Sequence, residues 1–130
     1  VRLCKGAYKE PPDRAFPDKA DVDANFAHIV EQFLNPEACA AGAYLGIATH
    51  DEKMISAAIA HIKQHNVPNE NFEFQMLYGI RAKLQQQLHD DGYKVRIYVP
   101  YGTQWYPYFM RRLAERPANI IFFVSNLFRR

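Results

Sequence analysis

Four polar side chains near the C-terminal end of the sequence form its sharpest candidate site. They stand at positions i, i+3, i+4 and i+7, which share one face of a helix, and they are Tyr108, Arg111, Arg112 and Glu115. Two adjacent guanidinium groups beside a phenol can clamp a small carboxylate, because each offers charge-assisted, bidentate hydrogen bonds. Glu115, four residues after Arg111, would hold an arginine in place. A solvated surface helix also carries arginine and glutamate at this spacing, so the spacing alone leaves both interpretations open.

Further polar side chains occur within or directly after short runs of β-forming residues. Reactive groups in parallel α/β folds gather where strands end and loops begin, so these side chains are also candidates. They are Arg2 and Lys5 on the first run, Thr49 and His50 after the second, Glu73 and Gln75 on the third, and Arg96 and Tyr98 on the fourth.

Each of these candidates has a structural interpretation as well. Arg96 could be a solvated residue at the start of a strand, Glu73 could form a structural ion pair, and His50 could cap the following helix. Lys5 has more to support a functional role, because Gly6-Ala7 follows it. Two small residues let the phosphate or ring of a ligand approach the backbone closely.

The elements that must position these groups are four repeats of a β-run followed by a segment with helical apolar spacing. The expected strands cover residues 1–7, 44–48, 72–77 and 95–99. The first helix should bury a stripe from Val22 to Leu34 and end at Asn35-Pro36. Thr49 or Asp51 should cap the second helix, Gly92 should close the third in a left-handed conformation, and the fourth should run from about residue 106 to 115.

Four βα units with short connections predict parallel strands joined by right-handed crossovers. An open doubly wound sheet and half of an eight-stranded barrel both fit this pattern. A whole barrel needs about 250 residues, so a chain of 130 residues would supply about half of one. The chain opens directly on a β-run without an initiating methionine, which suggests a fragment.

Composition argues against several classes of protein. Sixteen basic and fourteen acidic side chains leave a net charge of +2, which does not indicate nucleic-acid binding. Cys4 and Cys39 lack zinc-like spacing, so we expect core cysteines in a reducing compartment. No run approaches the roughly 18 apolar residues of a membrane span, and the start has no signal-peptide layout. We therefore expect a soluble protein.

Five motifs, in one order and spanning nearly the whole chain, resemble the proline dehydrogenase family. Any one of them would be a weak signal, whereas their joint order is highly specific. They are Arg2-Leu3-Cys4-Lys5-Gly6-Ala7-Tyr8, Ala48-Thr49-His50, Phe72-Glu73-Phe74-Gln75-Met76-Leu77, Arg96-Ile97-Tyr98-Val99-Pro100 and Tyr108-Phe109-Met110-Arg111-Arg112-Leu113-Ala114-Glu115.

The resemblance implies a flavin enzyme on a (β/α)8 barrel, with residues 1–130 as its last four βα units and no second domain, as in the monofunctional bacterial form. It implies oxidation of L-proline to Δ1-pyrroline-5-carboxylate, the first step of proline catabolism. Electrons would pass through FAD to a membrane quinone. The implied location is the cytoplasm, with peripheral contact at the inner face of the membrane.

The resemblance also implies roles for individual residues, and it implies no metal. Arg2 would lie against the reactive edge of the flavin and act in catalysis together with Tyr98. The remaining cofactor contacts would be Lys5, Gly6, Ala7, Thr49, His50 and Gln75. The substrate contacts would be Leu77, Tyr98, Tyr108, Arg111 and Arg112, with Glu115 bracing the arginines.

The sequence departs from the family pattern at two positions, since Cys4 stands where valine is frequent and Lys9 where a bulky residue is common. The substrate-facing lysine and aspartate of the family belong to strands that would precede Val1.

Two other hypotheses stay open. One is an aldolase-like lyase that forms a Schiff base at Lys5. The other is a non-catalytic half-barrel that self-associates through its open strand edges. The half-barrel should have little or no activity unless a complementary N-terminal half or a second copy closes the barrel.

Overall fold

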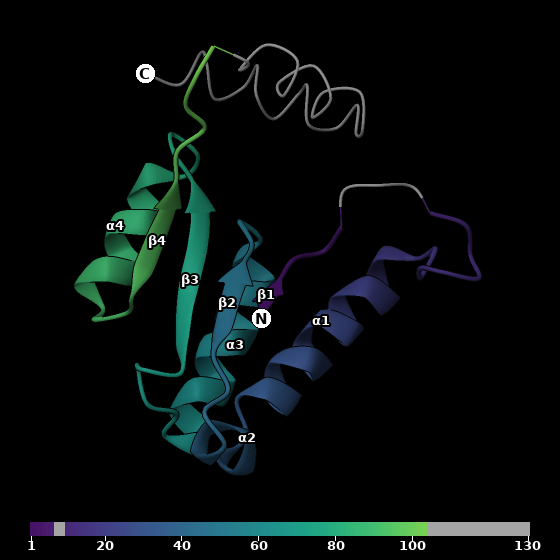
Figure 1. Ribbon diagram of the computed structural model, residues 1–130, viewed down its shortest axis with the longest axis horizontal. Coiled ribbons are helices and arrows are strands. Elements are labelled where there is room, and N and C mark those ends of the chain that lie inside the picture. The colour runs from purple at the N-terminus through teal and green to yellow at the C-terminus, as the bar shows by residue number, and fades with distance from the viewer. Residues whose placement is uncertain (7–9, 104–130) are drawn as a thin grey trace.

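Four parallel strands form one sheet whose strand order follows the chain (Figure 1). The computed structural model describes residues 1–6 and 10–103. The strands are β1 (Arg2–Leu3), β2 (Leu45–Ala48), β3 (Phe72–Leu77) and β4 (Val95–Tyr98). The helices are α1 (Lys19–Phe33), α2 (Pro36–Ala40), α3 (Glu52–His65) and α4 (Ala82–Asp90). The expected α/β class with a parallel sheet is confirmed. The expected fourth helix lies outside the described residues.

The sheet order bears on the two arrangements that the sequence alone left open. The order β1-β2-β3-β4 makes each strand the neighbour of the next one along the chain. Right-handed crossovers between such strands place every connecting helix on the same face. A doubly wound sheet instead reverses its strand order at one point. The described strands contain no such reversal.

One face of the sheet forms the apolar core with the helices. Along β3, Phe72, Phe74 and Met76 are at most 1% exposed. Because side chains alternate along a strand, Glu73 and Gln75 stand on the opposite face. Burial of each large apolar side chain contributes about 1.5–3 kcal/mol, so this face fixes the register of the sheet. The helical members of the same core cluster include Phe26 and Val30 from α1, Met54, Ile55, Ala58 and Ile62 from α3, and Leu88 from α4.

Side-chain and glycine caps fix where the helices begin and end. The Asp51 carboxylate accepts a hydrogen bond from the Lys53 backbone amide at 3.0 Å, which confirms the expected cap of α3. Gly92 follows α4 with φ +86, the left-handed conformation expected for it. Asn35 ends the first helical segment as expected, and its side chain also caps the short helix α2.

The first strand is shorter than the seven residues expected. Its pairing begins at Val1, whose carbonyl accepts a hydrogen bond from the Gly46 amide at 2.8 Å. After Leu3 the chain leaves the sheet, and Gly6 adopts φ +63, which is incompatible with an extended strand. The sequence pattern could not show this, because Lys5 turns toward carboxylates that come from other elements.

The described helices include none that is long and apolar enough to cross a membrane.

Candidate functional site

The face of the sheet opposite the helices carries a row of polar side chains, which we call the polar face. The strand register aligns Arg2 with Gly46, and Gly46 with Glu73. One step along the strands, Gln75 is paired with Arg96. The polar face therefore brings together four predicted site residues from three strands, which are Arg2, Gln75, Leu77 and Tyr98. It also holds Glu73 and Arg96, and Gly46 and Ala48 are its small members on β2.

Glu73 is the centre of the hydrogen bonding on the polar face. It is only 5% exposed. Its carboxylate accepts from both Nε and Nη2 of Arg96, from the Tyr44 hydroxyl at 2.9 Å and from the Gln75 amide at 2.7 Å. The Arg96 hydrogen bonds lower the pKa of Glu73 to about 2, against the opposing effect of burial. The structural ion pair considered for Glu73 is therefore present, and Arg96 is paired rather than simply solvated.

Arg2 is connected to this centre through one side chain. Its Nε donates to Oε1 of Gln75 at 2.8 Å. Among the described residues, Arg2 has no other side-chain partner, so its two terminal nitrogens remain available to an anionic or electron-rich group. A guanidinium anchored at one nitrogen and exposed at the others suits the edge of a ligand.

His50 links the ends of β2 and β3. Its Nε2 accepts a hydrogen bond from the Leu77 backbone amide at 2.9 Å. A backbone amide can only donate, so the proton of the neutral ring must sit on Nδ1. Burial, and to a smaller extent the charge of Arg81, lowers the pKa of His50. His50 is therefore a neutral donor through Nδ1 at the carboxyl edge of the sheet.

Thr49 directly precedes this histidine and is 8% exposed. Its hydroxyl oxygen accepts from the Asp51 amide at 3.1 Å. Thr49 and Asp51 thus share the start of α3, which was expected of one or the other. This turn is what places His50 beside β3.

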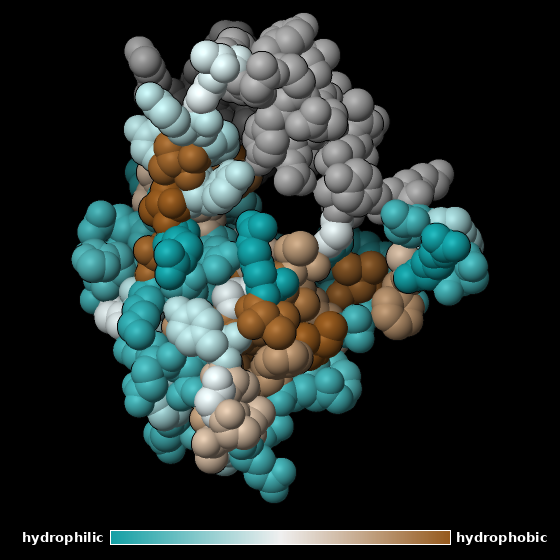
Figure 2. All heavy atoms as spheres, viewed as in Figure 1, coloured by the Kyte–Doolittle hydropathy of each residue, from teal (hydrophilic) through white to brown (hydrophobic). Residues whose placement is uncertain are grey.

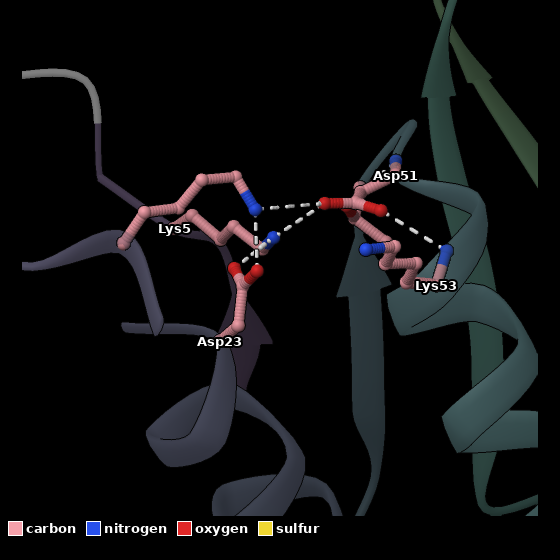
Figure 3. Close-up of polar contacts among 6 residues, drawn as sticks. Lys5, Asp23, Asp51 and Lys53 are labelled. Atoms are coloured by element: carbon pink, nitrogen blue, oxygen red, sulfur yellow. Dashed lines mark hydrogen bonds and ion pairs between the residues drawn. The ribbon is translucent and has the colours of Figure 1, made fainter. Parts of the chain in front are cut away.

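The Lys5 side chain lies in an ion cluster among the helices (Figure 3). Its ammonium donates to Asp23 of α1 and, at 2.7 Å, to Asp51 at the start of α3. Lys19 also contacts both carboxylates. Hydrogen bonds from the two lysines, led by Lys19, lower the pKa of Asp23, and the hydrogen bond from Lys5 does most to lower the pKa of Asp51. Lys5 was predicted to contact the cofactor, but its ammonium group is already held by two carboxylates.

Of the remaining predicted site residues, one is described and five lie in other parts of the sequence. Ala7, Tyr108, Arg111, Arg112 and Glu115 lie outside the described residues. Gly6 is described, and its left-handed backbone directly follows Lys5. Within residues 1–6 and 10–103 there is no cluster of three or more histidine, cysteine, aspartate or glutamate side chains that could hold a metal ion.

Sequence reasoning missed three residues that shape the site, namely Tyr44, Gly46 and Asp23. Tyr44 directly precedes β2 and Gly46 is its second residue, and alternation alone could have placed both on the polar face. Their partners could not be assigned, since a single sequence does not contain the register between strands. Asp23 stands on the first turns of α1, where an acidic residue is ordinary.

Comparison with known proteins gives a consistent result. A family model described as proline dehydrogenase matches residues 1–124. Proline dehydrogenase 2 of Bacillus subtilis is 54% identical over 123 residues, covering 94% of this chain and 39% of that protein. Proline dehydrogenase of Deinococcus radiodurans is 50% identical over 127 residues, covering 98% of this chain and 39% of that protein. The chain thus spans about two fifths of the length of these curated relatives.

A solved structure with a similar fold is that of proline utilization A from Bdellovibrio bacteriovorus, inactivated by N-propargylglycine. The TM-score is 0.69 at 32% sequence identity, and the match covers 78% of this chain and 11% of that one.

Proposed function

The chain belongs to the proline dehydrogenase family, and we propose that it supplies part of the FAD site and the substrate carboxylate clamp of an enzyme that oxidises L-proline to Δ1-pyrroline-5-carboxylate. The observation that carries this proposal is the Arg2 guanidinium, anchored to Gln75 on the polar face with its terminal nitrogens exposed. Family membership supports a flavin as the ligand of this guanidinium.

The proposed architecture is a (β/α)8 barrel in which this chain forms the last four βα units. The sequential order of four parallel strands supports it, because a barrel wall has that order and a doubly wound sheet does not. The polar face would then line the barrel interior, and the helices would form the outer ring. The carboxyl ends of the strands, where Thr49 and His50 stand, would form the rim that carries the active site.

Arg2 of the polar face and the residues after β1 and β2 have the chemistry that a flavin needs. When bound, FAD supplies the redox chemistry by accepting a hydride equivalent from the substrate. The cationic Arg2 would stabilise the electron-rich reduced ring, and the neutral His50 would donate from Nδ1 to a cofactor acceptor. Thr49 would pack beside the cofactor, and Gly6 with Ala7 would let it approach the backbone. The Lys5 side chain would hold that loop rather than contact the cofactor directly.

The substrate would be held by a clamp of two arginines. Arg111 and Arg112 would bind the proline carboxylate through bidentate hydrogen bonds, with Tyr108 beside them and Glu115 bracing them. Tyr98 and Leu77 would shape the pocket for the ring, and they are paired in register at the carboxyl ends of β4 and β3. Tyr98 is 48% exposed on the described surface, so a ligand can reach it. Catalysis would then come from positioning the substrate against the flavin.

The sequence spans about two fifths of the length of its curated relatives, so residues outside 1–130 would complete the site. We propose that upstream βα units, a complementary N-terminal half or a second copy pack against the β1 edge. Figure 2 shows apolar surface where β1 lies beside α1. A pocket there has an apolar lining that includes Leu3, Val22, Phe26 and Ile29.

Electrons would leave the reduced flavin for a quinone, which implies peripheral contact with a membrane at the cytoplasmic face.

The competing Schiff-base lyase has less support. An ammonium that donates to Asp23 and Asp51 has no lone pair to attack a carbonyl, so Lys5 is poorly placed as a nucleophile. Borohydride treatment with carbonyl substrates separates the two functions. For the full-length protein we expect bound FAD before the treatment and no adduct at Lys5 after it. A trapped adduct at Lys5 in a flavin-free protein would overturn the proposal in favour of the lyase.

Gel filtration of this chain with and without FAD distinguishes the proposed flavin enzyme from a non-catalytic, self-associating half-barrel. The proposal expects stoichiometric FAD only when the barrel is completed. A cofactor-free dimer that stays cofactor-free after addition of the upstream units would favour the half-barrel instead.

A further inference from the structure

Gln75 reaches across a whole strand to contact Arg2. In register, Gln75 of β3 is paired with Ala48 of β2 and Arg96 of β4. Its amide nevertheless accepts from Arg2 on β1, which lies beyond β2 in the sheet. The side chain therefore has to cross β2 along the surface of the polar face.

Gly46 provides the space for this crossing. A Cβ atom at Gly46 would lie 2.5 Å from Nε2 and 2.9 Å from Cδ of Gln75, closer than non-bonded atoms allow. Gly46 is not among the glycines with positive φ, so its backbone conformation does not itself require glycine. The requirement at this position is for room beneath the Gln75 amide.

Glu73 decides which end of that amide faces Arg2. The Gln75 Nε2 donates to Oε1 of Glu73 at 2.7 Å. An ionised carboxylate only accepts hydrogen bonds, so it selects the NH2 end of the amide and leaves the carbonyl oxygen for the Arg2 donor. Arg96 and Tyr44 in turn fix the carboxylate from the other side. A reversed amide would place two donors against each other at Arg2.

We propose that Gln75, lying over Gly46 and oriented by Glu73, is a positioning residue that aims the Arg2 guanidinium at the flavin. The inference rests on the proposed function, in which Arg2 faces FAD. Gln75 then acts indirectly, through Arg2. Gly46 contributes to the site by having no side chain, which leaves room for the Gln75 amide.

The test uses Gln75→Leu in the full-length protein loaded with FAD. Leucine is similar in size but accepts no hydrogen bond from Arg2. The expected result is retained flavin, unchanged affinity for a non-oxidisable carboxylate analogue of proline, and flavin reduction by L-proline that is slower by about tenfold. In an Arg2→Gln background, Gln75→Leu should have no further effect on that rate. Equal slowing in both backgrounds, or a wild-type rate in Gln75→Leu, overturns the inference.

Gln85→Leu is the matched control. Gln85 is also partly buried, and its amide donates to the carbonyls of Leu77 and Ile80 without contacting Arg2. It should lower stability but leave the rate of flavin reduction unchanged. Slowing equal to that in Gln75→Leu would mean a general loss of stability and would overturn the positioning role.

Gly46→Ala tests the crossing itself. It should displace the Gln75 amide and slow flavin reduction as Gln75→Leu does. If this variant folds poorly, Gly46→Ala combined with Gln75→Ala removes the clash, so thermal stability should recover while reduction stays slow. A wild-type rate in the double variant overturns the inference. A wild-type protein that binds no FAD overturns the proposed function and the inference together, whereas a competent wild type with an unaffected Gln75→Leu overturns only the inference.

Discussion

The His50 imidazole accepts a hydrogen bond from the Leu77 amide at 2.9 Å and so ties the carboxyl end of β2 to that of β3. Only the unprotonated Nε2 can accept, so this link exists only while the ring is neutral. His50, predicted to contact the cofactor, is therefore joined to Leu77, predicted to contact the substrate, through the titratable imidazole of His50.

Acidification should weaken this link. Burial, followed by the charge of Arg81, holds the pKa of folded His50 below its ordinary value of 6.5. The unfolded chain then binds more protons, so stability is full above the ordinary value and falls as pH drops toward the lowered pKa. Denaturant unfolding from pH 7.5 down to 5 should show this loss in the wild type. His50→Gln cannot titrate and should lose less over the same range. Parallel curves for the two proteins would contradict the assignment.

Glu73→Gln should destabilise the sheet. The variant removes the buried charge that Arg96, Gln75 and Tyr44 all bind, at an expected cost of about 1–3 kcal/mol in the free energy of unfolding. The pKa of Glu73 is lowered to about 2 from an ordinary 4.5, so its contribution is complete above pH 4.5 and is lost below it. Urea denaturation at pH 7 measures the cost.

The control for this variant is Glu52→Gln, which breaks the exposed pair with Arg81. A surface ion pair contributes little, so its effect should be clearly smaller. Equal effects of Glu73→Gln and Glu52→Gln would mean that the network on the polar face is not a stabilising centre.

Removal of the Lys5 ammonium should leave Asp23 and Asp51 with only the exposed Lys19 ammonium, among the described residues, to offset their repulsion. Lys5→Met is therefore expected to lower stability by about 1–2 kcal/mol, and Asp51→Asn in the same chain should recover part of the loss. Thermal unfolding of the single and double variants measures this coupling. Lys19 is 73% exposed, so Lys19→Met serves as the control and should change stability less. Strictly additive effects of Lys5→Met and Asp51→Asn would refute the ion cluster.

Arg112→Ala should separate substrate binding from cofactor binding. Loss of one guanidinium fork should weaken proline affinity by about tenfold or more, since it removes charge-assisted hydrogen bonds, while flavin content is retained. Arg112→Lys keeps the charge without the planar fork, so its proline affinity should lie between those of the wild type and Arg112→Ala. Titration of the flavin absorbance with proline gives the affinity. Lost flavin with unchanged proline affinity would reverse the assignment.

The sequence was sufficient wherever a local pattern decided the structure. β3 was predicted over its full length, because the alternation of Phe72, Glu73 and Phe74 indicates one buried and one polar face. The Asp51 cap and the left-handed Gly92 were also predicted from local chemistry. In these cases the relevant partners lie within a few residues along the chain.

Contacts between residues far apart along the chain could not be predicted from the sequence. Lys5 lies next to a small-residue pair, which favoured a ligand contact, but its partners come from α1 and from the start of α3. No sequence pattern singles out Gly46, because the Gln75 side chain lies over it only in the folded sheet. An ion pair was considered for Glu73 as an alternative, but Arg96 was not identified as its partner, because the sequence does not say which strands are neighbours.

Anaerobic mixing of the FAD-loaded full-length protein with L-proline tests whether this chain takes part in flavin-dependent oxidation of L-proline. We expect bleaching of the oxidised flavin absorbance, with Δ1-pyrroline-5-carboxylate formed in equal amount. A full-length protein whose bound flavin stays oxidised in the presence of saturating L-proline would contradict it.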